Sequence, residues 1–166
     1  MGPKILFIFI LFFVNDKEND IQTIRKMFTE AVEKKEKAEH LISVLSSKPK
    51  TPLINGYLGA VNMVMAKHAI NPFSKLSFFN TGKGYLDSSI KQNNSDPELR
   101  LLRYTIQVSA PSFLSYNSEI SADRAFLMNS LNSEKIEDKQ LQLAIANFLK
   151  LQKCTPTEKK MISKYL

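Results

Sequence analysis

The chain has few of the residues that most often carry metal binding, disulfide bonding or nucleophilic catalysis. Among its 166 residues are one cysteine, Cys154, two histidines and no tryptophan. A single cysteine excludes an intrachain disulfide, and one cysteine with two histidines argues against a dedicated zinc site. Neither a Ser/His/Asp or Cys/His set nor a carboxylate pair can be assembled from the sequence with any specificity. We therefore expect a protein without a metal, a cofactor or an enzymatic activity.

Glycine is also scarce, and so are runs in which apolar and polar residues alternate. The chain has 5 glycines and 7 prolines, with 43% hydrophobic and 23% charged residues. This composition argues for a globular domain and against an all-β fold. Apolar residues recur instead at helical spacing, which predicts helices over 20–45, 53–70, 73–92, 97–109, 118–131 and 134–153, and a short one from Pro156. We expect an all-α fold, a single domain over 19–166 of about seven helices in stacked antiparallel hairpins.

Local signals describe some of these helices in more detail. Asp96 is a candidate cap for the helix at 97–109, and Thr155 with Glu158 forms a capping box before the last helix. In the helix at 73–92, periodicity predicts that Leu76 and Phe79 face inward. Gly82 and Gly84 in its middle suggest a division into two shorter helices.

The first residues have the order of a secretory signal peptide. Lys4 precedes the apolar run ILFIFILFFV at residues 5–14, and a polar segment follows. Ten apolar residues are too few to span a membrane as a helix, and no cysteine follows for lipid attachment. A site with small residues for cleavage is missing, so a buried first strand or an interfacial anchor is the alternative. We favour export to the periplasm or the medium, with residues 1–18 as the signal-like segment and no stable membrane span in the mature chain.

Positive charge is in excess but is not gathered into one block of sequence. The net charge is +7, carried by isolated lysines and arginines. Such a charge permits contact with nucleic acid or an anionic membrane without specifying either. Because export would separate the protein from nucleic acid, we do not favour a nucleic-acid partner.

The segment DPELRLLRYTIQVS at residues 96–109 predicts a helix that is apolar around most of its circumference, which is typical of a buried helix. Arg100, Arg103 and Gln107 share one narrow polar stripe on it. They could line a groove for a carboxylate or phosphate group, or they could form an internal ion pair. Asp123 lies on the apolar face of the helix predicted at 118–131, so we favour pairing of Asp123 with Arg103 or Arg100.

Two further places combine polar and aromatic residues. Lys67, His68, Asn71 and Lys75 surround a helix–helix corner, which makes them a candidate recognition site. The simpler interpretation is that His68 packs near a helix C-terminus. The loop at 110–117 includes Tyr116 and could be a partner-binding edge, although we favour its folding back onto the core.

Residues 54–127 carry a set of motifs that resembles an uncharacterised family of small all-helical bacterial proteins. The motifs are GYxGA at 56–60, MAKH at 65–68, NPFSK at 71–75, ELR at 98–100 with LR at 102–103, Gln107, PSFL at 111–114, Tyr116 and Asp123. The helix–Asp-Pro–helix junction at residues 96–97 is also similar to tetratricopeptide repeats, without a second copy at their period. The resemblance implies a helical-hairpin fold and assigns no activity.

These features together predict a non-enzymatic helical module that binds a protein or peptide partner, such as an envelope protein. Stacked helical hairpins offer extended surfaces for such binding. The alternative is a small-molecule or lipid-binding protein in which Arg100 and Arg103 hold an anionic group. That alternative requires an enclosed pocket in which both guanidinium groups lack acidic partners.

Overall fold

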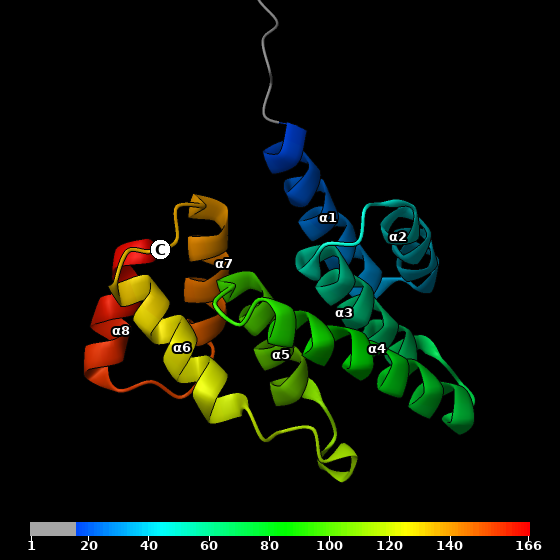
Figure 1. Ribbon diagram of the computed structural model, residues 1–166. Helices are drawn as coiled ribbons and strands as arrows, with labels where there is room; N and C mark the ends of the chain where they lie inside the picture. Colours follow the sequence, from blue (N-terminus) through cyan, green and yellow to red (C-terminus); the bar gives the residue numbers. More distant parts are fainter. Residues whose placement is uncertain (1–15) are drawn as a thin grey trace, which may run out of the picture.

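The protein is all-helical, as the sequence predicts. A computed structural model describes residues 16–166, with side chains from residue 20 onward, and the apolar run at 5–14 lies outside this part (Figure 1). The described chain forms eight α-helices and two 3-10 turns and has no strand. The α-helices are α1 (Asp16–Glu33), α2 (Lys35–Ser47), α3 (Pro52–His68), α4 (Pro72–Gln92), α5 (Pro97–Ser109), α6 (Ile120–Asn132), α7 (Lys139–Lys150) and α8 (Pro156–Ile162).

The segment predicted as one helix over 20–45 is two helices. Lys34 has an extended backbone between α1 and α2, with φ −134° and ψ 128°. No apolar residue occurs between Val32 and Ala38, so no continuous face holds the two pieces in line. The chain turns there, and α2 buries Ala38, Leu41 and Leu45. Because α1 begins at Asp16, the predicted boundary between residues 18 and 19 falls inside a helix.

Close backbone contact between α3 and α4 forms the centre of the first half of the molecule. A Cβ added to Gly59 would lie 2.7 Å from the Gly82 carbonyl oxygen, and one added to Gly82 would lie 2.5 Å from the Gly59 carbonyl oxygen. The two glycines therefore face each other across the helix pair. This contact explains why α4 continues through Gly82, where the sequence suggested a division into two shorter helices.

Helix α5 lies between two apolar cores. Leu99 and Leu102 belong to the core built with α1–α4, whereas Tyr104 belongs to the core built with α6–α8. The helix is not buried all round, since Val108 is 39% exposed. Its buried face includes Glu98, Arg103 and Gln107, so polar side chains occupy part of the interior.

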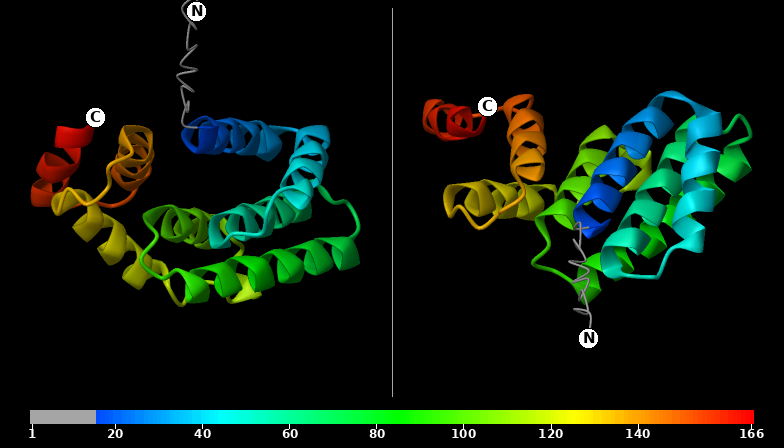
Figure 2. Two further views of the ribbon diagram at one scale, coloured as in Figure 1. Left: turned by 45° about the horizontal axis from the view of Figure 1, so that its top comes forward. Right: turned by 90° about the horizontal axis from the view of Figure 1, so that it is seen from above.

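The last two helices begin at side-chain caps. Asp138 accepts hydrogen bonds from the backbone of Gln140 and Leu141, which starts α7 at Lys139 rather than at residue 134 as predicted. Thr155 and Glu158 form the predicted capping box at the start of α8. Helix α8 and the α3–α4 corner lie at opposite ends of the molecule in every view (Figures 1 and 2). No helix within residues 16–166 is long and apolar enough to cross a membrane.

Candidate functional site

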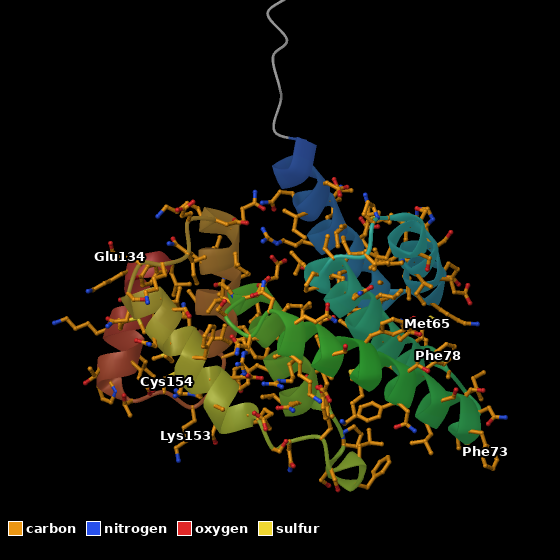
Figure 3. The ribbon with its side chains drawn as sticks, viewed as in Figure 1. Met65, Phe73, Phe78, Glu134, Lys153 and Cys154 are labelled. Atoms are coloured by element: carbon orange, nitrogen blue, oxygen red, sulfur yellow. The ribbon has the colours of Figure 1, made fainter. Side chains whose placement is uncertain are left out.

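Three large apolar side chains are exposed at and just after the connection between α3 and α4. Ile70 is 95% exposed, Phe73 is 84% exposed and Leu76 is 50% exposed. We call this group the apolar corner. Phe73 projects from the end of α4, whereas Phe78 and Met65 lie further along the helix pair (Figure 3). Leu76 was predicted to face inward with Phe79, so its exposure is a correction.

Local sequence signals fix the geometry of the apolar corner. Ala69 ends α3 in an extended conformation, and its N–H donates to the Met65 carbonyl. The Asn71 carboxamide oxygen accepts a hydrogen bond from the Phe73 N–H at 2.8 Å and caps α4. Pro72 occupies the first position of that helix. A short connection with both helix ends satisfied therefore holds Phe73 outward on a defined backbone.

Lys67 and His68 attach this corner to the end of α1. The Lys67 ammonium donates to the Val32 carbonyl at 3.0 Å, and His68 Nε2 lies 2.9 Å from the Ala31 carbonyl oxygen. A carbonyl oxygen only accepts, so Nε2 is the donor in this hydrogen bond. Both side chains satisfy carbonyls of the last turn of α1, which places them in a structural role. Lys75 is the fourth residue predicted at this corner. It is exposed, and its side chain has no hydrogen bond or ion pair among the described interactions.

Arg100 and Arg103 converge on Asp123, a carboxylate with no exposed surface. Arg103 donates from Nε and Nη2 to the two Asp123 oxygens at 2.7 Å each, and Arg100 donates from Nη1 at 2.8 Å. Burial by itself would lower the pKa of Arg103, but the bonds and charge of Asp123 raise it above its ordinary value. Both pairings considered from the sequence are therefore present together. The two guanidinium groups already have an acidic partner, so the requirement of the anion-binding alternative is not met.

Gln107 and Tyr116 lie beside this ion-pair cluster and differ in their hydrogen bonding. The Tyr116 hydroxyl donates to Asp87 at 2.8 Å, and its ring packs edge-on against Phe79. Burial, followed by the bond to Asp87, raises the pKa of Tyr116. Gln107 is 3% exposed, and its amide has no hydrogen-bond partner among the described residues. The 110–117 loop folds back through Leu114 and Tyr116 as favoured, but Phe113 remains 81% exposed.

A second ionic network was missed by the sequence analysis. Arg25 of α1 donates to both Glu98 oxygens at 2.7 Å and to Asp138 at 2.7 Å, which joins α1 to α5 and to the start of α7. The Tyr57 hydroxyl also donates to Glu98. Burial, followed by the charge of Glu98, raises the pKa of Tyr57. Glu98 and Asp138 lie 73 and 113 residues from Arg25 in the sequence, so residue spacing could not predict either ion pair.

The surface is also hollowed where α6 meets the α7–α8 connection. A hollow of about 430 Å³ is lined by Arg124, Lys153, Cys154, Thr155 and Glu158. The Cys154 thiol donates to the Leu149 carbonyl at 3.2 Å, and Arg124 Nη2 lies 3.7 Å from its sulfur. Within the described part of the chain, no three His, Cys, Asp or Glu side chains group as metal ligands. Arg124 and Glu158 form an ion pair at 2.7 Å in the lining of this hollow.

No family model matches the chain, and neither a curated protein nor a solved structure is significantly similar to it. The resemblance to a family of small helical bacterial proteins therefore stays an expectation from the sequence. The apolar corner is the candidate binding site. The predicted residues Asn71 and Lys75 lie at its edge.

Proposed function

We propose that this protein is an exported, non-enzymatic helical module that binds a protein or peptide partner at the apolar corner. The observation that carries the proposal is the exposure of Ile70, Phe73 and Leu76 within seven residues of sequence. Isolated apolar residues are ordinary on protein surfaces, but a contiguous group of large ones marks interaction sites.

The chemistry of the apolar corner favours a protein surface as partner. Phe73 is a large aromatic side chain with little conformational freedom, which is the kind of residue that anchors protein interfaces. Its backbone is held by the Asn71 cap, so binding would require little reordering. Lys75 lies at the edge of the group and is exposed. We infer a partner with an apolar pocket or helix face bordered by acidic side chains.

Site-specific photo-crosslinking tests this proposal directly. A photoreactive phenylalanine analogue is introduced at Phe73 in the full chain, expressed in its native host and irradiated. The same analogue at Leu143 of α7, which is 43% exposed and lies away from the corner, is the matched control. We expect one discrete adduct from position 73 and none from position 143. Equal or absent labelling at both positions would remove the apolar corner as a binding site.

The adduct then gives a partner against which variants are measured. Phe73→Asp places a charge in the apolar contact, and we expect its affinity for the identified partner to fall at least tenfold, on the scale of a lost anchor residue. Asn80→Asp, also exposed on α4, adds the same charge outside the corner and should change affinity less than about twofold. Equal losses of affinity in both variants would reject the apolar corner as the binding site.

Export is tested by cell fractionation with intact mass measurement of the recovered chain. The order of charge, apolar run and polar segment over residues 1–18 supports export. We expect a periplasmic or secreted species that lacks roughly the first 15–20 residues. A cytosolic species that retains the apolar run would reject export, while leaving the test at Phe73 unaffected.

A further inference from the structure

Lysines are frequent in residues 150–166, a stretch that includes α8. This stretch lies at the end of the molecule opposite the apolar corner (Figure 2). Residues 150–166 carry five lysines, all exposed: Lys150, Lys153, Lys159, Lys160 and Lys164. The segment has one acidic side chain, Glu158, which forms an ion pair with Arg124 at 2.7 Å. This end of the molecule is therefore strongly basic, which corrects the expectation that the positive charge is spread along the chain.

The outward face of α8 presents the lysines together. Ile162 is buried and Met161 is half-buried, which turns the opposite side of this short helix to solvent. At 100° per residue, Lys159 and Lys160 fall on that solvent side. Lys164 follows in the 3-10 turn Ser163–Tyr165 and is exposed as well. Lys153 lies at the neighbouring α7–α8 connection (Figure 3).

Exposed leucines accompany this charge. Leu151 is 79% exposed and Leu166 is 49% exposed. Lysine ammonium groups beside apolar side chains match an anionic bilayer surface, where the lysines meet lipid phosphates and the leucines enter the acyl boundary. Single-stranded nucleic acid would instead favour aromatic platforms, and the aromatic residue of this segment, Tyr165, is half-buried with its hydroxyl bonded to the Leu131 carbonyl.

We propose that the α8 end of the molecule binds the surface of an anionic phospholipid bilayer through Lys159, Lys160 and Lys164, with Leu151 as the apolar contact. This contact is separate from the apolar corner, because the two lie at opposite ends of the molecule. A protein held at α8 keeps Phe73 free for a partner. The inference does not depend on what binds the apolar corner.

The test is flotation of the full chain with vesicles of phosphatidylglycerol and phosphatidylcholine in equal parts, against vesicles of phosphatidylcholine alone. One variant combines Lys159→Gln, Lys160→Gln and Lys164→Gln. The matched control combines Lys26→Gln, Lys34→Gln and Lys91→Gln, three exposed lysines on α1–α4 that change the net charge equally. Any association through residues 5–14 is common to all of these chains. Circular dichroism checks that both variants retain their helices.

We expect binding to the anionic vesicles that weakens at high salt and is lost in the α8 variant. Each lysine at an anionic surface contributes about a fivefold factor, so the loss is on the order of 100-fold. The control variant should lose less than about threefold. Leu151→Ser should lower binding about tenfold at every salt concentration, because its effect is apolar.

Three outcomes would overturn the proposal. The first is equal binding to anionic and neutral vesicles. The second is equal loss in the α8 and control variants, which would show a dependence on net charge alone. The third is tighter binding to a single-stranded oligonucleotide than to anionic vesicles at the same salt concentration, which would assign the lysines to nucleic acid.

Discussion

The two halves of this molecule are held together in different ways. In helices α1–α5, α3 and α4 approach each other backbone to backbone at Gly59 and Gly82. Helices α6–α8 are joined to the rest by charge as well as by apolar contact, since Asp123 of α6 holds two arginines of α5 and Asp138 at the start of α7 holds Arg25 of α1. The α3–α4 contact is therefore sensitive to an added atom, and the α5–α6 contact at Asp123 is sensitive to a lost charge.

The comparison shows two solutions to the packing of short helices. Glycines that face each other let two helix backbones come close, which fixes their relative position by shape. A buried carboxylate that bonds to two guanidinium groups fixes position by hydrogen-bond geometry, and it contributes specificity at a cost in desolvation.

Asp123→Ala should have the largest effect on stability. It leaves Arg103 buried without its carboxylate partner, and breaking a buried ion pair in this way costs about 3–5 kcal/mol. The measurement is the free energy of unfolding from denaturant titration. Glu119→Gln is the control, because Glu119 lies 3.6 Å from the same arginine and its side chain is 45% exposed, so its loss should cost less than about 1 kcal/mol. Equal effects would show that the burial of Asp123 is not what matters.

Gly59→Ala and Gly84→Ala should change stability in opposite directions. An alanine Cβ at position 59 would lie 2.7 Å from backbone atoms of Gly82 and Leu86, and such overpacking costs about 1–3 kcal/mol. At position 84 an added Cβ meets nothing within 4 Å, so the higher helix propensity of alanine should stabilise by about 0.5–1 kcal/mol. Thermal unfolding of both variants checks the pair. A stabilising Gly59→Ala would contradict the close approach of α3 and α4.

Asp138→Ala should cost about 1–2 kcal/mol, since it removes both the cap of α7 and the ion pair with Arg25. Asp138→Ser keeps a capping oxygen but not the charge, so the difference between the native chain and Asp138→Ser isolates the ion pair at less than about 1 kcal/mol. Burial by itself would raise the pKa of Asp138, but hydrogen bonds from the Leu141 backbone and from Arg25 hold that pKa below its ordinary value. The advantage of the native chain over Asp138→Ala should therefore disappear as the pH falls through that lowered pKa. An advantage that is independent of pH would contradict this assignment.

Glu158 should titrate at an unusually low pH. A hydrogen bond from Arg124, followed by one from the Thr155 N–H, lowers the pKa of Glu158 to about 2. The bonded form stabilises the fold above the ordinary pKa of a glutamate, and this contribution is lost as the pH falls towards 2. In Arg124→Gln, an NMR titration of the Glu158 carboxyl group should show the pKa moved back towards the ordinary range. An unchanged pKa would assign the shift to the capping box alone.

The parts of the fold that the sequence predicted depend on short stretches of chain. The caps at Asp96 and Thr155 were identified from their own first turns. The pairing of Asp123 with Arg100 and Arg103 was accessible because the partners lie 23 and 20 residues apart on two helices whose faces could be assigned. The break at Lys34 was missed, because an interruption in a charged run has no glycine or proline to mark it.

The candidate site was predicted only in part. The sequence placed Asn71 and Lys75 at a corner but expected Leu76 to face inward. Periodicity gives the relative directions of side chains on one helix, and it does not say how much of that face a neighbour covers. For the same reason Val108 was expected inside and is 39% exposed.

By itself the sequence determined that the chain is helical, where most helices begin and which residues share a helix face, because caps and periodicity act within a few residues. Only the tertiary structure decided which faces meet. It brought Arg25 to Glu98, 73 residues away, and left Phe73 uncovered. Burial and ion pairing between helices depend on where whole helices lie relative to one another, which no local pattern encodes.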